Sequence, residues 1–276
     1  MTLHRGYLET SFGQLHYAEA GTGPAVLMLH QTPRSLDEFA ELSADLATDH
    51  RAIAMDMPGF GLSSRPPGPL TIEAMAAGAL ALLDGLAIPD AVVVGHHTGA
   101  VVAQELAAGA PERIRALVLS AMPWVGPERR ARGGVPVDHA TRQDDGGHLV
   151  EIWRQRQPYY PPHRPDLLDR TIRDALAPGL DPTEGHRAVG SYVMEQRIGV
   201  VRAPTLLLCA DRDPFSSPSI DTVGAALTGA ASVQVHHLLE GTIPLMETCT
   251  AEVAGAIRSF LATLPTPERG QSQEQE

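Results

Sequence analysis

The sequence contains no lysine, because every one of its 21 basic side chains is arginine. This absence excludes reactions that depend on a lysine Schiff base, a pyridoxal-phosphate lysine or a P-loop lysine. Basic side chains are also outnumbered by 33 acidic ones, and the formal net charge is −12. Because a protein that binds nucleic acid neutralises phosphates with basic side chains, we expect no nucleic-acid partner.

Cysteine and long apolar runs are scarce as well. The two cysteines, Cys209 and Cys249, are too few for a disulfide scaffold. Their spacing along the chain is not that of a metal site, so we expect no bound metal. Residues 1–10 contain no apolar stretch long enough for a signal peptide, and no run reaches the length needed to span a membrane. We therefore expect a cytoplasmic protein without a membrane partner.

Short, continuously apolar runs alternate with helical patterns along most of the chain. The runs are Ala25–Leu29, Arg51–Met55, Ala91–Val94, Ile114–Leu119, Thr205–Ala210 and Ser232–Leu238. The helical patterns are Ser35–Leu46, Thr71–Leu86, Thr98–Gly109, a helix that opens at Ser217, and Thr250–Leu264. Apolar runs without alternation are typical of strands buried on both faces. The sequence therefore predicts an α/β fold with a doubly wound, mostly parallel sheet, preceded by a hairpin over residues 7–20.

One stretch, residues 121–198, interrupts this alternation. It holds both tryptophans and three of the five tyrosines. We interpret it as a helical cap inserted between two parts of the core, residues 1–120 and 199–264, with a polar, disordered tail at 265–276. Tyrosine and tryptophan suit the lid of a pocket because they have an apolar body and a polar tip. They could equally serve only to dock the cap on the core.

A sharp turn is predicted after the third apolar run, at Gly95–Gly99. The order is strand, Gly-x-x-x-Gly, helix, which is the pattern of a nucleophile elbow. Small flanking residues permit a strained turn that lifts the middle side chain, here His97, above the sheet. The helix that follows directs its free N–H groups toward the same place.

Together with four other segments, this turn makes the chain similar to the α/β-hydrolase superfamily, especially its capped members of the haloalkane dehalogenase and C–C hydrolase type. The other segments are His30–Pro33, Asp56–Ser63, Ala203–Asp213 and Gly241–Glu247. They resemble, in order, the oxyanion segment, an Asp-x-Pro-Gly-x-Gly-x-Ser turn, the strand that presents the catalytic acid and the segment that carries the catalytic histidine. The resemblance covers nearly the whole chain. It implies the α/β-hydrolase fold with a helical cap, and it makes Asp213 the acid.

The family's catalytic residues do not all carry over. The elbow residue is His97 in place of serine, and Thr242 stands where the family has its catalytic histidine. The glycine of the oxyanion segment is Gln31, and no Gly-x-Ser-x-Gly occurs in the sequence. A Ser-His-Asp mechanism therefore cannot be written for this chain.

We predict instead that His97 reaches into the space left by the smaller Thr242 and meets Asp213. The helix N-terminus favours a neutral imidazole, and the carboxylate would fix its tautomer, which together make a general base. Backbone N–H groups of Gln31, Thr32 and Thr98 are candidates for an oxyanion hole. The predicted substrate-binding residues are His30, Trp124, His148, Trp153, Tyr159, Tyr192 and Thr242.

The predicted function is that of a cofactor-independent enzyme acting on a small apolar carbonyl compound, such as an ester, lactone or ketone. General-base chemistry fits hydrolysis, and it fits a lyase, isomerase or cyclisation step equally well. One alternative is a degenerate hydrolase that only binds a ligand. Another is ordinary ester hydrolysis with an unrecognised nucleophile, and direct attack by the imidazole is a third. A homodimer is possible.

Overall fold

The computed structural model describes residues 3–131, 138 and 141–265. Eight strands form one sheet in the order β1-β2-β4-β3-β5-β6-β7-β8. Their bounds are β1 (His4–Thr10), β2 (Gly13–Ala20), β3 (Ala25–Leu29), β4 (Arg51–Met55), β5 (Ala91–His96), β6 (Ile114–Ser120), β7 (Thr205–Ala210) and β8 (Val233–Leu238). The first two strands pair antiparallel as the predicted hairpin, and β3 to β8 run parallel. The predicted sheet is confirmed.

The inner parallel strands, β3 to β7, are mostly apolar because both faces of the sheet are covered there. The edge strand β8 differs from the expected buried run, since most of its residues are exposed. In β3, Leu27 and Leu29 pack into one core cluster, while Val26 and Met28 pack into the cluster on the opposite face. Alternate side chains of a strand point to opposite faces, so each run must be apolar at every position.

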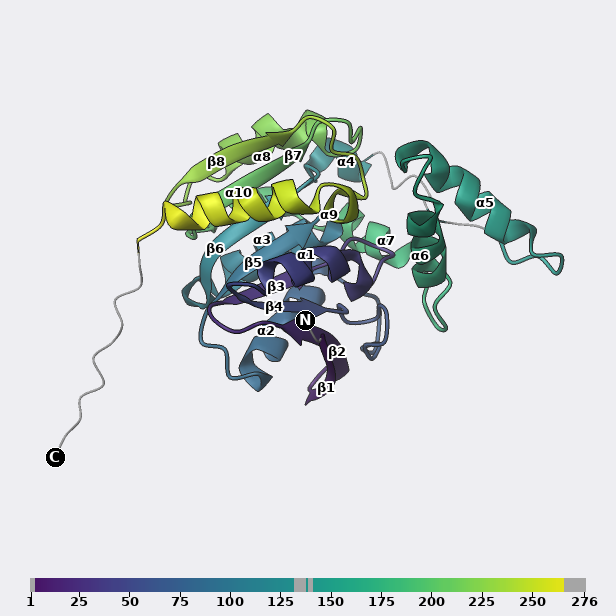
Figure 1. The fold of residues 1–276 in the computed structure, drawn as a ribbon, viewed down its shortest axis with the longest axis horizontal. Coiled ribbons are helices and arrows are strands. Elements are labelled where there is room, and N and C mark those ends of the chain that lie inside the picture. Colours follow the sequence, from purple (N-terminus) through teal and green to yellow (C-terminus); the bar gives the residue numbers. More distant parts are fainter. Residues whose placement is uncertain (1–2, 132–137, 139–140, 266–276) are drawn as a thin grey trace.

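Helices cover both faces of the sheet. One core cluster packs beneath α2 (Ile72–Gly85), α3 (Thr98–Gly109) and α8 (Ile220–Ala226). The other packs beneath α1 (Ala40–Leu46), α9 (Leu245–Thr248) and α10 (Thr250–Ala262). Figure 1 shows α1 and α10 side by side on one face of the sheet. The expected helix at Ser35–Leu46 is divided, since a 3₁₀ helix, η1 (Leu36–Phe39), precedes α1.

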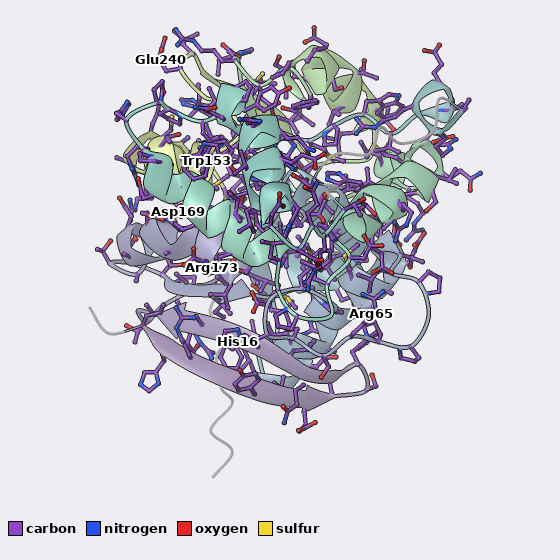
Figure 2. All side chains as sticks on the ribbon, turned by 90° about the vertical axis from the view of Figure 1, so that its right-hand side faces the viewer. His16, Arg65, Trp153, Asp169, Arg173 and Glu240 are labelled. Carbon is purple, nitrogen blue, oxygen red and sulfur yellow. The ribbon has the colours of Figure 1, made fainter. Side chains whose placement is uncertain are left out.

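The chain between β6 and β7 contributes helices and, in its described part, no strand. The helices are α4 (Pro127–Ala131), α5 (Gly147–Arg156), α6 (Pro165–Ala175) and α7 (Glu184–Ser191). Figure 1 shows α5 and α6 projecting to one side of the sheet, and Figure 2 looks onto that side, with Trp153 on α5 and Arg173 on α6. That this segment acts as a cap stays a prediction.

Two further sequence expectations concern the ends of the chain and the membrane. The predicted disordered tail lies, from residue 266 onward, outside the described residues. Across residues 3–131, 138 and 141–265, no helix combines the length and the apolar character needed to cross a bilayer.

Candidate active site

His97 occupies a strained turn between β5 and α3. Its backbone has φ 48° and ψ −112°, a region that side-chain-bearing residues rarely adopt. Gly99 permits this turn, because a Cβ atom there would lie 2.0 Å from the carbonyl oxygen of Leu29. The His97 N–H donates to Ser120 O at 3.0 Å, which joins the turn to the end of β6. The fold therefore holds the imidazole at the carboxyl edge of the sheet, where ligands of α/β sheets bind.

The structure places His97 beside Asp213, in the loop that follows β7. His97 Nε2 lies 2.9 Å from Asp213 Oδ2, although the ring N–H and the oxygen are not aligned as a hydrogen bond. The Asp213 side chain is fully buried, whereas 13% of the His97 side chain is exposed. The imidazole is thus the member of the pair that solvent or a ligand can reach.

Asp213 is held as a carboxylate by its surroundings. It accepts hydrogen bonds from the Ser216 hydroxyl at 2.6 Å and from the Phe215 N–H at 2.9 Å. Burial by itself would raise the pKa of this carboxyl, but His97 and these two donors outweigh burial and lower the pKa to about 2.

His96, next to the elbow residue, has a positioning role. Its Nε2 donates to Ile243 O at 3.0 Å, and its Nδ1 pairs with the Ser120 hydroxyl at 3.0 Å. Desolvation lowers the pKa of this fully buried ring to about 4, so the ring is neutral. It packs edge-on against the His97 ring with 4.7 Å between centroids, which supports the orientation of His97.

Two backbone donors remain free near the elbow. Neither the Thr32 N–H nor the Thr98 N–H has a hydrogen-bond partner within the described part of the chain. The buried Thr32 hydroxyl also lacks one there. Thr98 is the first residue of α3, and the close approach of Gly99 to Leu29 brings the oxyanion segment beside it. These N–H groups can donate hydrogen bonds to an oxygen that becomes negatively charged and so stabilise it, and this role stays a prediction.

The prediction that Gln31 supplies an oxyanion donor is wrong. Its backbone N–H donates to Glu38 Oε2 at 2.8 Å, and its side-chain amide donates to the other carboxylate oxygen of Glu38. Glu38 lies in η1 and is fully buried, so its carboxylate requires donors from the protein. Nothing in the sequence indicated that this acidic residue folds back onto Gln31.

His30 and Tyr192, predicted as substrate contacts, form hydrogen bonds within the protein, and their contact with substrate stays a prediction. Both ring nitrogens of the buried His30 are used, since Nε2 accepts the Met57 N–H at 3.0 Å and Nδ1 pairs with Gln31 O at 2.7 Å. The buried Tyr192 donates a hydrogen bond from its hydroxyl to Glu105 Oε2 at 2.6 Å, and its ring packs in the core cluster beneath α2, α3 and α8. The polar atoms of both side chains form hydrogen bonds within the protein and link segments of the fold.

The other proposed substrate contacts lie in different surroundings. Trp124 is half-buried against the core cluster beneath α2, α3 and α8. Trp153 packs on a small apolar cluster formed by Tyr160, Leu167 and Leu168. His148 Nδ1 accepts a backbone N–H at the start of α5, and Thr242 is half-buried. Tyr159 alone among them is linked by a described contact to the site, because its ring lies 5.2 Å from that of Phe215. Their contact with substrate stays a prediction.

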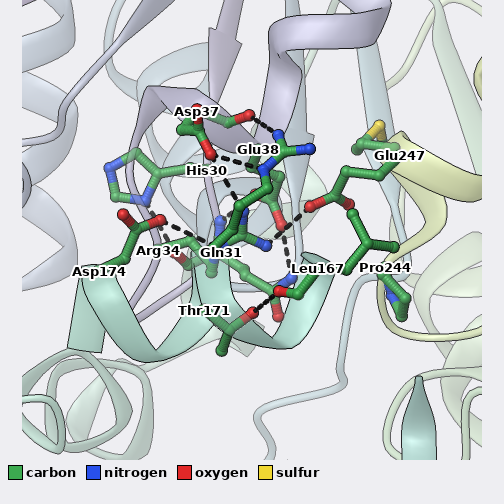
Figure 3. A network of polar contacts seen from close by, with 12 residues as sticks. His30, Gln31, Arg34, Asp37, Glu38, Leu167, Thr171, Asp174, Pro244 and Glu247 are labelled. Carbon is green, nitrogen blue, oxygen red and sulfur yellow. Dashed lines mark hydrogen bonds and ion pairs between the residues drawn. The ribbon is translucent and has the colours of Figure 1, made fainter. Parts of the chain in front are cut away.

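Sequence reasoning missed a buried arginine, Arg34, that joins three segments distant in the sequence. The Arg34 side chain is only 1% exposed, and it pairs with Asp174 of α6 at 3.0 Å and with Glu247 of α9 at 2.8 Å (Figure 3). Burial, reinforced by the charge of Glu38, raises the pKa of Glu247 to about 7 despite the opposing arginine. Arg34 directly follows the oxyanion segment, but its partners lie about 140 and 213 positions away, so spacing could not identify them.

Comparison with known proteins adds a family to this geometry. Residues 24–145 match the family model described as alpha/beta hydrolase fold. A solved hydrolase from Pseudomonas aeruginosa PA01 superposes with a TM-score of 0.76 at 26% identity, covering 93% of this chain and 98% of the other. The chain has the α/β-hydrolase fold.

Other proteins resemble parts or all of the chain. Bifunctional epoxide hydrolase 2 of Mus musculus is 34% identical over 127 residues, which are 45% of this chain and 23% of that protein. The epoxide hydrolase of Caballeronia sordidicola is 38% identical over 114 residues, 40% of this chain and 35% of that protein. The enol-lactonase of Burkholderia xenovorans LB400 shares the fold, with a TM-score of 0.75 at 20% identity, covering 93% of this chain and 100% of the other. The chain spans well under half the length of the two epoxide hydrolases.

Proposed function

We propose that this protein hydrolyses a small apolar ester or lactone without a cofactor, with His97 as the general base. The observation that carries the proposal is the 2.9 Å separation of His97 Nε2 from the buried Asp213 carboxylate at the elbow. An enol-lactonase and esterases among the proteins of the same fold support this substrate class.

The proposed mechanism starts from the tautomer that Asp213 favours. The negative charge of the carboxylate beside Nε2 favours the tautomer with its proton on that nitrogen and a lone pair on Nδ1. Nδ1 removes a proton from water while the water oxygen attacks the substrate carbonyl. The imidazolium formed is stabilised by Asp213, whose low pKa keeps it charged.

The charge on the attacked carbonyl oxygen needs donors. The Thr32 and Thr98 N–H groups are suited to this, because neither is consumed by the described part of the fold. Collapse of the tetrahedral intermediate expels the alkoxide, and the imidazolium returns its proton to that oxygen. The same base and donors would also remove a proton next to a carbonyl and stabilise the enolate, which is the non-hydrolytic form of the proposal.

The experiment is turnover of a panel of chromogenic esters and lactones by the wild type and by His97→Gln. We expect His97→Gln to lower kcat by about 10²–10⁴, the usual contribution of a general base. Saturable binding of panel members by the wild type with no turnover would instead favour a ligand-binding protein. Labelling of a serine by a fluorophosphonate would refute the base mechanism in favour of a covalent nucleophile.

A pair of exchange variants tests the roles of the two departed positions. His97→Ser by itself is expected to be inactive, because Thr242 cannot act as a base. Adding Thr242→His to His97→Ser restores the residue types of a Ser-His-Asp triad and is expected to give measurable esterase activity. A folded but inactive double variant would contradict the placement of Thr242 opposite the elbow.

A further inference from the structure

A second cluster of reactive side chains lies at the carboxyl ends of β7 and β8. Cys209 lies near the end of β7, and Asp211 is the first residue after that strand. His237 of β8 is the register partner of Cys209. One potential ligand atom from each side chain lies within 4.8 Å of the other two. It is the one such group of three in the described part of the chain, and it includes neither His97 nor Asp213.

We propose that Cys209, Asp211 and His237 form a binding site for a divalent transition-metal ion of the Zn²⁺ type. Thiolate, carboxylate and imidazole are the three side-chain ligand types that zinc binds in proteins. Tetrahedral zinc, with bonds of about 2.0–2.3 Å, places its ligand atoms about 3.5 Å apart. The 4.8 Å span therefore needs only side-chain rotation to close around an ion.

Access and geometry both fit an ion that enters from solvent. Cys209 is buried at the floor of the cluster, Asp211 is half-buried, and 53% of the His237 side chain is exposed on the edge strand. His237 Nδ1 lies 2.8 Å from Asp211 Oδ1, so two of the ligands already meet. Three protein ligands leave the fourth tetrahedral position to water.

The ion would replace a proton on the cysteine. Cys209 is buried, and a cysteine binds a metal ion as the thiolate. Binding of the cation forms the metal–sulfur bond and releases that proton to solvent. Affinity is therefore expected to increase with pH.

An ion at this cluster would also brace the strand ends that lead to the active site. Asp211 N donates to Leu238 O at 3.1 Å, and Arg212 N donates to Gly241 O at 2.9 Å. The first strand end continues to Asp213 and the second to Thr242. A metal cross-link between them would stabilise the folded state in proportion to ion binding.

The test measures binding of Zn²⁺ and Co²⁺ to the full-length protein by chelator competition and absorption spectroscopy. We expect one equivalent bound, with a thiolate-to-cobalt charge-transfer band. His237→Ala is expected to weaken binding at least about tenfold. His236→Ala is the matched control, because its ring is 42% exposed on the same strand but lies toward Glu252 of α10, and it is expected to bind as the wild type does.

Cys209→Ser should abolish the charge-transfer band, and Asp211→Asn provides a more exposed ligand change if the buried substitution impairs folding. Wild-type protein that binds no stoichiometric ion would overturn the proposal. Binding that is unchanged in both His237→Ala and Asp211→Asn would overturn it too, because the ion would then lie elsewhere. Neither result bears on turnover by His97.

Discussion

Replacing Arg34 by methionine should destabilise the protein strongly. The guanidinium is 1% exposed and pairs with Asp174 and Glu247. The change leaves Glu247 buried without its cation, whereas Asp174 keeps its second pair, with Arg173. Breaking a buried pair in this way costs about 3–5 kcal/mol. For a domain of this size the loss corresponds to a decrease of roughly 6–20 °C in Tm.

The pH dependence gives this prediction a second, independent signature. The folded-state pKa of Glu247 is about 7, above the ordinary 4.5, so the folded protein binds more protons than the unfolded chain between these values. Stability from this group is therefore fully present below about pH 4.5 and is lost as the pH rises through 7. Without Arg34 the pKa rises further, so the penalty of Arg34→Met is expected to be larger at pH 8 than at pH 5.5.

Urea unfolding at both pH values, followed by circular dichroism, measures the effect. Arg258→Met is the matched control, because Arg258 also pairs with two acids, Asp45 and Asp49, but its side chain is 33% exposed. That surface change is expected to cost about 0–1 kcal/mol. Equal losses for the two variants, or a penalty for Arg34→Met that does not change with pH, would refute the reasoning.

Three other changes test the site and the fold. Asp213→Asn is expected to lower kcat by about 10²–10⁴ with little change in KM. Because the pKa of Asp213 is about 2, the wild-type rate should show no ionisation of this carboxyl above about pH 4. Steady-state kinetics that show an unchanged kcat in Asp213→Asn, or such an ionisation in the wild type, would contradict the prediction. Gly99→Ala should lower the free energy of unfolding in urea by about 3 kcal/mol or more, because its Cβ would clash with backbone. Gly255→Ala, with open space at its Cβ, should raise the free energy of unfolding by about 0.5–1 kcal/mol. Equal effects of the two changes would contradict the packing of the elbow. Thr71→Ala removes the side-chain cap of α2 and is expected to cost about 1 kcal/mol by the same measurement, with no loss counting against the cap.

The sheet could be predicted closely because its signal is local. Buried parallel strands are apolar at each position, and β3, β4 and β7 begin and end where the apolar runs do. The elbow was predictable for a related reason, because the glycines on either side of His97 are required by close backbone contacts. Thr71 as the cap of α2 follows from the same local chemistry.

Contacts between distant segments were beyond the sequence. Gln31 was expected to face a ligand, but it faces Glu38, whose burial depends on how η1 packs. Aromatic composition could not separate Tyr192, bound to Glu105 in the core, from Tyr159 beside Phe215.

The spacing of Cys209 along the chain predicts no metal site, but spacing does not show which residues lie beside Cys209 on the neighbouring strand. The ligand spacing of a metal site is visible in sequence when the ligands share a short loop. Here the partner of Cys209 is His237, 28 positions away in the numbering, and only strand register brings the two together. A buried thiol at the end of a strand therefore has to be examined with the residues opposite it.

The dependence of kcat/KM on pH, compared between the wild type and His97→Gln on the best ester or lactone of the panel, tests the account most directly. A general base predicts a wild-type rate that rises with pH through a single ionisation, and a residual, pH-independent rate in the variant. A variant that keeps the wild-type profile and rate would show that the imidazole at the elbow is not the base.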